Sequence, residues 1–156
     1  MNIPILILCI VIPLAVGGIS SFATSSSIKT WFVTLKKPSF NPPNYLFAPV
    51  WTLLYILMGV SLYIIWQSPS GNARINALTI FGIQLFLNFS WSFVFFYFRK
   101  ISLALLDIML LWIAIVIMIF LFFWIDPLAA YLQIPYLLWV SFATALNGAI
   151  RKLNYR

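Results

Sequence analysis

The chain contains no histidine, two acidic residues and one cysteine among its 156 residues. Without histidine it lacks the commonest general base and metal ligand of proteins. Two acids, Asp107 and Asp126, do not suffice for a carboxylate metal cage or favour a paired-carboxylate hydrolase, so we expect no metal site. The lone Cys9 excludes a disulfide framework, and its place in an apolar run predicts a buried packing residue.

Charge is scarce as well, because only 7% of residues are charged while 64% are hydrophobic and the mean hydropathy is +1.07. Several unbroken apolar runs are long enough to cross a hydrocarbon core of about 30 Å, which indicates membrane-spanning segments. The runs are continuous rather than alternating, which favours helices over a β-barrel. The net charge of +7 is therefore expected to face anionic membrane lipids, and no nucleic-acid partner is expected.

These runs predict an all-α membrane protein, a five-transmembrane-helix bundle in one domain over residues 1–156. The expected spans are about 3–23, 45–66, 73–98, 101–124 and 129–150. The first span has no basic segment before it and no convincing cleavage site, so we expect a retained helix rather than a signal peptide. Only Arg99 and Lys100 separate the third span from the fourth, which makes those two helices antiparallel neighbours.

The basic residues predict the orientation. With five spans, all of the nine lysines and arginines except Arg74 fall on one side of the membrane. These are Lys29, Lys36, Lys37, Arg99, Lys100, Arg151, Lys152 and Arg156. The positive-inside rule then places the N-terminus outside, and the C-terminus and the 24–44 loop on the cytoplasmic side.

The one long polar connection, residues 24–44, is expected to form a stiff lid over one end of the bundle. Proline fixes φ and restricts the residue before it, and the loop carries Pro38, Pro42 and Pro43. A short helix is expected around Ile28–Leu35. Just beyond the loop, Trp51 and Tyr55 are spaced i, i+4 and share one helix face, which places Trp51 beneath the lid.

Amides, tryptophans and glycines converge on several spans, in the half next to the lid except for Gln84 and Trp139, which are expected nearer mid-membrane. They are Gly17 and Gly18 on the first span, Trp51 on the second, Gln84, Asn88 and Trp91 on the third, and Trp139, Ala143, Leu146 and Asn147 on the fifth. Flat apolar walls with a few orienting hydrogen bonds predict an intramembrane pocket. Plainer roles stay open for each residue: hydrogen bonding between helices for amides such as Asn147, interfacial anchoring for tryptophans and close packing for glycines.

Two further features concern the membrane interior. Asp107 lies two turns into the fourth span, where a charge is costly, so it should face the bundle or a cation such as Lys100. It could serve a structural contact or proton coupling. Ala73 and Ala77 form a small-xxx-small pair, which suggests helix association and a homodimer.

Five ordered motifs carry a family resemblance. They are W-F-x-x-L-x-K-P-x-F-x-P-P from Trp31, A-P-V-W-T-x-L-Y ending at Tyr55, Q-L-x-L-N-x-x-W from Gln84, the acidic Asp107 followed by Leu110–Leu111–Trp112, and P-Y-L-x-W…F-A-x-x-L-N from Pro135. In this order and spacing the chain resembles the TspO/MBR family over nearly its whole length. The resemblance implies a five-helix bundle, usually dimeric, that binds porphyrins such as protoporphyrin IX and haem and also benzodiazepine-type ligands.

The resemblance also implies a set of pocket residues. They are Trp31, Phe32, Pro42, Pro43, Trp51, Tyr55, Asn88, Trp91, Ala143 and Leu146, to which the convergence of polar and aromatic groups adds Trp139 and Asn147. Relatives that degrade protoporphyrin in light imply photochemical roles for Trp51 and Trp139. Eukaryotic members carry a cholesterol-recognition pattern in which a tyrosine follows soon after the Leu–Asn pair. That pattern is absent here, because Leu146 and Asn147 are followed by Gly148.

The leading hypothesis is a membrane binding and sensory protein for tetrapyrroles that needs no cofactor of its own. The macrocycle would stack on Trp51 and Trp139, and its propionates would face Lys36 and Lys37. Because histidine is absent, we expect stacking rather than strong axial ligation of iron. One alternative is a light-dependent protoporphyrin-degrading enzyme. Another is a small proton-coupled exporter of porphyrins or lipids that uses Asp107.

Overall fold

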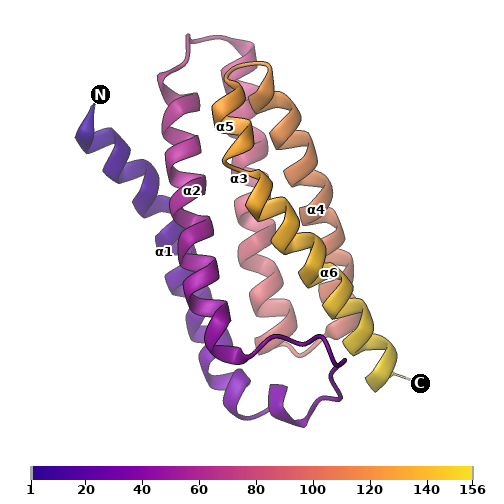
Figure 1. Ribbon diagram of the computed structural model, residues 1–156. Coiled ribbons are helices and arrows are strands. Elements are labelled where there is room, and N and C mark those ends of the chain that lie inside the picture. Colours follow the sequence, from indigo (N-terminus) through magenta and orange to yellow (C-terminus); the bar gives the residue numbers. More distant parts are fainter. Residues whose placement is uncertain (1, 156) are drawn as a thin grey trace.

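The computed structural model describes residues 2–155, and these form a bundle of long helices without strands (Figure 1). The long helices are α1 (Ile3–Lys29), α2 (Phe47–Gln67), α3 (Asn72–Ser92), α4 (Ile101–Phe123) and α6 (Ile134–Asn154). The short elements are η1 (Phe32–Thr34), η2 (Asn44–Leu46), a π-helical turn η3 (Phe93–Tyr97) and α5 (Pro127–Tyr131).

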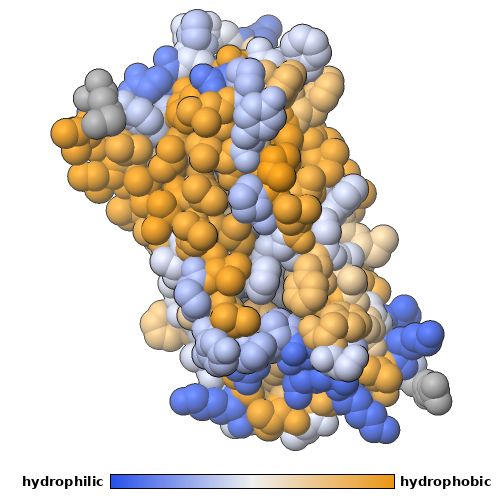
Figure 2. Space-filling view, viewed as in Figure 1, coloured by the Kyte–Doolittle hydropathy of each residue, from blue (hydrophilic) through white to orange (hydrophobic). Residues whose placement is uncertain are grey.

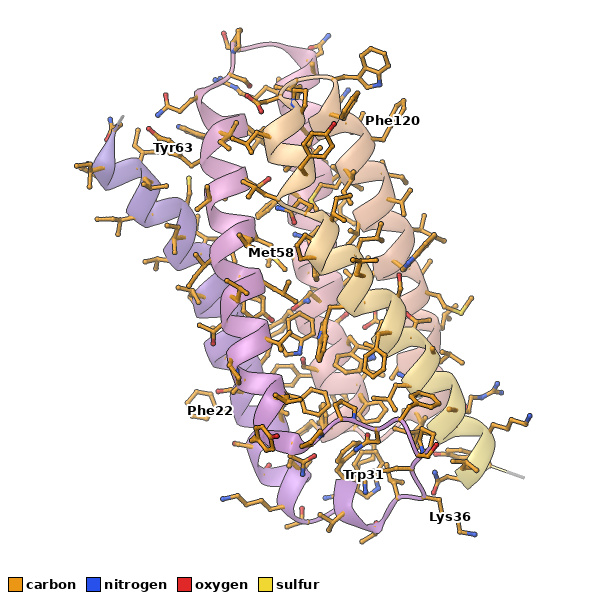
Figure 3. All side chains as sticks on the ribbon, in the orientation of Figure 1. Phe22, Trp31, Lys36, Met58, Tyr63 and Phe120 are labelled. Carbon is orange, nitrogen blue, oxygen red and sulfur yellow. The ribbon has the colours of Figure 1, made fainter. Side chains whose placement is uncertain are left out.

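Five segments of the chain are long and apolar enough to cross a membrane: Ile3–Lys29, Asn44–Gln67, Asn72–Tyr97, Ile101–Ile125 and Pro127–Asn154. This confirms the predicted five-transmembrane-helix bundle and makes the chain an integral multi-pass membrane protein. The space-filling view shows a wide apolar belt, with hydrophilic side chains gathered at the two ends (Figure 2). Large apolar side chains such as Phe22 and Phe120 point outward from this belt, while Met58 is fully buried between helices (Figure 3).

Helix α1 is longer than predicted. The expected first span ended near residue 23, with residues 24–44 assigned to the lid, but α1 continues to Lys29. The polar run after residue 23 stays helical because its hydroxyls bond to nearby carbonyls: Thr24 Oγ1 donates to Ser20 O at 3.1 Å, and Thr30 Oγ1 to Ser26 O at 2.8 Å. The expected short helix around Ile28–Leu35 is also wrong, because only the single turn η1 follows α1.

The fifth span is broken near its start, whereas one continuous helix from about residue 129 was predicted. Asp126 caps α5 by accepting from the backbone N–H groups of Leu128 and Ala129 at 2.8 and 3.3 Å. The chain then turns through Leu132 and Gln133, and Pro135 lies in the first turn of α6. Proline lacks an N–H and disfavours helix before it, which accounts for the break.

The third span ends in an unusual connection. After α3 the π-helical turn η3 leads to Arg99, which has a positive φ of 57°, and α4 begins two residues later at Ile101. A π-helical turn leaves carbonyls without their usual partners, and Ser27 Oγ of α1 donates to one of them, Phe96 O, at 2.7 Å. Helix α1 is thereby tied to the end of α3.

Two predictions concern the membrane interior. Asp107 faces the bundle, which was one of its two predicted alternatives: Ser90 Oγ of α3 lies 3.0 and 2.9 Å from the two carboxylate oxygens. Ala77 is fully buried inside the bundle, so the Ala73–Ala77 pair does not present a surface to a second copy. Cys9 is a buried free thiol among apolar neighbours, as its surroundings in the sequence predicted.

Candidate ligand pocket

A cavity of about 420 Å³ lies in the half of the bundle next to the lid loop, which in the structure comprises residues 30–43. Its volume is within the range of small-molecule sites. The lining residues are Leu14, Gly17, Gly18, Ser20, Ser21, Thr24, Ser25 and Ile28 of α1, Phe32 of η1, Asn44 of η2, Phe47, Ala48, Trp51, Thr52 and Tyr55 of α2, Trp91 and Ser92 of α3, and Phe96 of η3. The cavity therefore lies between α1, the start of α2 and the end of α3.

One wall is a pair of stacked aromatic rings. Trp51 and Tyr55 have centroids 5.5 Å apart and an interplanar angle of 27°, because their i, i+4 spacing places them on one face of α2. Gly17 of α1 lies directly against the Tyr55 ring, so that a Cβ at this position would overlap the ring. The pair thus offers a flat apolar surface, held in place from the α1 side by a residue without a side chain.

A buried chain of hydrogen bonds fixes Tyr55 from the other side. The Tyr55 hydroxyl donates to Asn88 Oδ1 at 2.7 Å, Asn88 Nδ2 donates to the Tyr136 hydroxyl at 3.0 Å, and that hydroxyl donates to Gln84 Oε1 at 2.9 Å. All four residues are buried. Such a chain in a low-dielectric interior strongly favours one arrangement, and here it locks α2, α3 and α6 together behind the cavity.

An aromatic cluster closes the cavity toward α3. Trp91 stacks on Phe95 with centroids 5.4 Å apart and meets Phe96 edge-on at 6.0 Å. In the amide orientation that satisfies both of its neighbours, Asn147 of α6 accepts from Trp91 Nε1 at 3.1 Å and donates to Ile101 O at 3.2 Å. The Trp91 indole is therefore held by α6 while its ring lines the cavity.

The lid loop is tied to the end of α6. Lys36 N donates to Asn154 Oδ1 at 3.0 Å, and Asn154 Nδ2 donates back to Lys36 O at 2.9 Å. Lys37 Nζ lies 4.8 Å from the centroid of the Phe32 ring, and Phe40 meets Phe142 edge-on at 6.2 Å. The loop crosses from α1 toward α6 and returns to α2 beneath the bundle in the view of Figure 1.

The structure brings four of the twelve predicted site residues to the cavity: Phe32, Trp51, Tyr55 and Trp91. Asn88 and Asn147 lie immediately behind it, each bonded to one of these side chains. Trp31 lies at the lid end of the bundle, edge-on to Phe95 at 5.7 Å and beneath the Arg99 guanidinium. These seven positions form one continuous region around the end of α3.

The other five predicted residues do not line this cavity. Trp139 packs edge-on against Phe47 at 6.0 Å and beside Phe142, on the α6 side of α2. Ala143 packs against the main core, and Leu146 is buried in the cluster of Phe32, Phe95 and Phe96. Pro42 and Pro43 lie in the lid loop, where Pro43 begins η2. Trp51 and Trp139 are thus not two walls of one cavity.

Four hydroxyl-bearing residues of α1 line the cavity and were not predicted: Ser20, Ser21, Thr24 and Ser25. Their signal was present in the sequence, because hydroxyls at i, i+1, i+4 and i+5 interrupt an otherwise apolar helix. The pattern is ambiguous because Thr24 and Ser25 begin a polar run that is equally typical of a loop, which leaves Ser20 and Ser21 at the end of the expected first span. Within residues 2–155 no charged side chain lines the cavity, whereas Lys36 lies at the lid end of the bundle and Lys37 lies near the ring of Phe32.

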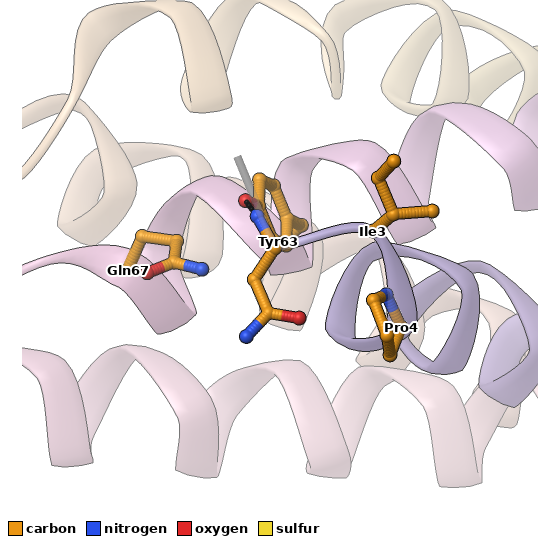
Figure 4. Close-up of a pocket in the computed structure, with 5 residues that line it drawn as sticks. Ile3, Pro4, Tyr63 and Gln67 are labelled. Atoms are coloured by element: carbon orange, nitrogen blue, oxygen red, sulfur yellow. Dashed lines mark hydrogen bonds between the residues drawn. The ribbon is translucent and has the colours of Figure 1, made fainter.

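A larger hollow of about 810 Å³ lies at the opposite end of the molecule, where Asn2, Ile3 and Pro4 approach Tyr63 and Gln67 (Figure 4). Asn2 N donates to the Tyr63 hydroxyl at 2.8 Å and so ties the start of α1 to α2. This hollow is broadly open and has one aromatic side chain. The smaller cavity, with its stacked aromatic wall, is the better candidate for a ligand.

The fold and the cavity define a multi-pass helical membrane protein with a ligand-sized space inside the bundle. A family model described as the TspO/MBR family matches residues 9–153. The chain is 44% identical over 155 residues to the tryptophan-rich protein TspO of Archaeoglobus fulgidus, with 99% of each chain covered. It therefore belongs to the TspO/MBR family, as its motifs predicted.

More distant relatives support the same family assignment. The chain is 35% identical over 127 residues to the translocator protein of Homo sapiens, which covers 80% of this chain and 75% of that protein. It is 34% identical over 125 residues to the tryptophan-rich sensory protein of Cereibacter sphaeroides, which covers 80% and 77% respectively. Family membership supports a translocator or sensor role in the membrane.

Proposed function

We propose that this protein binds tetrapyrroles, such as protoporphyrin IX or haem, within the membrane and acts as a sensor of them. The observation that carries the proposal is the stacked Trp51–Tyr55 wall of a ligand-sized cavity, with Trp91 on another side. A flat macrocycle gains most from flat aromatic surfaces. Benzodiazepine-type ligands, which are apolar and carry aromatic rings, fit the same proposal.

Charge complements this arrangement. The macrocycle is apolar but carries two propionates, which are costly to bury without a partner. Lys36 lies at the lid end of the bundle (Figure 3), and Lys37 Nζ lies 4.8 Å from the centroid of the Phe32 ring, which lines the cavity; neither lysine is part of the lining. The propionates would lie toward these lysines, where opposite charge and water lower the desolvation penalty. The proposed binding mode requires no cofactor. Because the chain has no histidine, we expect haem to bind by stacking, without a histidine ligand to its iron.

Replacement of Trp51 by alanine tests the proposal. We expect roughly tenfold weaker binding of protoporphyrin IX, because the variant loses one ring of the stacked wall and its buried area. The measurement is a titration of the purified protein that follows the Soret absorption of the porphyrin. Trp124→Ala is the matched control, since Trp124 is 74% exposed at the far end of α4. Equal affinity in the wild type and Trp51→Ala would contradict the placement.

A light-dependent degradation of protoporphyrin is the second candidate, and Trp51 favours it because its indole lies at the cavity and could donate an electron to an excited macrocycle. Trp139 lies behind Phe47 and is less suited to that role. Illumination of the complex separates the two functions. A defined product that disappears in Trp51→Phe, while binding is retained, would identify an enzyme.

Proton-coupled export finds less support. Asp107 is bonded to Ser90 and does not line the cavity.

The orientation with the N-terminus outside and the lid loop cytoplasmic remains part of the proposal, supported by the basic residues around the lid end. Association with anionic lipid at that end and a homodimer complete it.

A further inference from the structure

One buried hydroxyl at the cavity has no hydrogen-bond partner. Ser20 of α1 lines the cavity and is only 4% exposed, and within the described part of the chain nothing bonds to its Oγ. A buried hydroxyl without a partner is costly, and native proteins seldom leave one. Among the buried side chains that line this cavity, Ser20 is therefore a polar group available to a ligand.

Two neighbouring hydroxyls of the same helix already donate hydrogen bonds to backbone carbonyls. Ser21 Oγ donates to Gly18 O at 2.6 Å, and Thr24 Oγ1 donates to Ser20 O at 3.1 Å. Both residues also line the cavity, yet their hydroxyl hydrogens are already used within α1. On the α2 side, Thr52 Oγ1 likewise donates to Ala48 O at 2.8 Å. Ser20 differs from these hydroxyls in having its donor free.

The position of Ser20 indicates the chemistry of its partner. At a rise of about 1.5 Å per residue, Ser20 lies roughly 13 Å along α1 from Lys29, well inside the membrane. Because no charged side chain lines the cavity within residues 2–155, an ionised carboxylate there would be poorly compensated. A neutral oxygen or nitrogen acceptor has no such penalty. The partner is also close to the flat wall, since Gly17 lies one helical turn from Ser20 and contacts the Tyr55 ring.

We propose that Ser20 donates a hydrogen bond to a neutral acceptor atom of the bound ligand and thereby orients it against the Trp51–Tyr55 wall. This inference rests on the proposed tetrapyrrole binding and specifies how the site reads its ligand. The charged groups of the ligand would lie toward the lysine-bearing end, while a neutral acceptor on its apolar body faces Ser20. Ser20 is then a positioning and specificity residue that the motifs of the sequence did not reveal.

The test compares Ser20→Ala with Ser26→Ala, using protoporphyrin IX and its dimethyl ester as probes; Ser26 is an exposed residue of α1 that does not line the cavity. The ester removes the charges and keeps neutral acceptors. We expect Ser20→Ala to weaken both probes roughly three- to tenfold, the value of one hydrogen bond, and Ser26→Ala to leave both affinities unchanged. Thermal unfolding without ligand is measured in parallel. It should be unchanged or higher in Ser20→Ala, because the substitution removes an unpartnered polar group.

Each other outcome overturns a defined part of the reasoning. Unchanged affinity of Ser20→Ala, in a protein that binds the probes, refutes the role of Ser20 and leaves tetrapyrrole binding intact. A weakened affinity accompanied by lower thermal stability makes the hydroxyl a structural group. A loss confined to the acid, with the ester unaffected, means that Ser20 contacts a carboxylate. If the wild type binds neither probe, the tetrapyrrole proposal itself fails, and the inference falls with it.

Discussion

The adjacent glycines of α1 provide a sharp test of how the cavity wall is built. A Cβ at Gly17 would overlap Tyr55 Cε2 and lie 2.7 Å from Cδ2 and 2.9 Å from Cζ, whereas a Cβ at Gly18 would meet no atom of residues 2–155 within 4 Å. The ring cannot easily move aside, because its hydroxyl is bonded to Asn88 and its face is stacked on Trp51. Replacement of each glycine by alanine should therefore have opposite effects.

The magnitudes can be estimated from the two contributions. Alanine favours a helix over glycine by up to about 1 kcal/mol, and this gain applies to both positions. Overpacking at Gly17 costs about 1–3 kcal/mol, which applies only there. We therefore expect Gly17→Ala to be less stable than Gly18→Ala by about 2 kcal/mol, or roughly 4–8 °C in the midpoint of unfolding. Displacement of the Tyr55 ring should also weaken porphyrin binding in Gly17→Ala alone.

The assay is thermal unfolding of both variants and the wild type in the same detergent, followed by circular dichroism, together with a porphyrin titration. Because the two glycines are neighbours on one helix, differences in expression or detergent contact are largely matched. If Gly17→Ala unfolded at the same temperature as Gly18→Ala, the described contact between α1 and Tyr55 would be incorrect. The aromatic wall of the proposed site would then lose its support from α1.

Two other substitutions test the packing of α1 and the attachment of the lid loop. Gly59→Ala should destabilise the protein by about 1–3 kcal/mol, because its Cβ would overlap the Ile10 Cα atom of α1. Gly82→Ala is the control, because no described atom lies within 4 Å of a Cβ there. Equal unfolding midpoints of the two variants would contradict this prediction. Asn154→Ala should remove both hydrogen bonds to Lys36 and so increase amide hydrogen exchange in the lid loop. The free energy of unfolding should change by only about 1 kcal/mol. Unchanged exchange in the lid loop would show that other contacts hold it.

The fold was predictable to a large extent because its main determinants are local. Apolar runs of membrane length gave five spans, and the two-residue connection at Arg99 and Lys100 made α3 and α4 neighbours. The end of α1 was not predictable from composition alone. The polar run after residue 23 suggested a loop, but serine and threonine can remain helical in a membrane by bonding to their own helix, as Thr24 and Thr30 do.

The sequence could predict how deep in the bundle the site residues lie, but not which way each helix is rotated about its axis. The stripes predicted that Trp51 and Trp91 lie in the half of the bundle next to the lid, and both line the cavity there; Trp139 was expected nearer mid-membrane. Sequence spacing fixes which residues share a face of one helix, but the direction of that face depends on how the helices pack. Packing turned Trp139 toward Phe47 and Phe142, away from the cavity that Trp51 lines. The Asn88–Tyr136 bond was equally invisible, because it joins residues 48 positions apart.

The tight junction between α3 and α4 bears on how this protein can be engineered. With a left-handed Arg99 and the Lys100 N–H donating to Val94 O at 3.0 Å, the junction has no slack for added residues. The turn between α2 and α3 can accept added residues, because Gly71 has a positive φ of 158°, a conformation that favours glycine, and its neighbours are exposed. Epitope tags or fluorescent reporters used to map the membrane topology therefore belong in the turn around Gly71, and an insertion at Arg99 would separate α3 from α4.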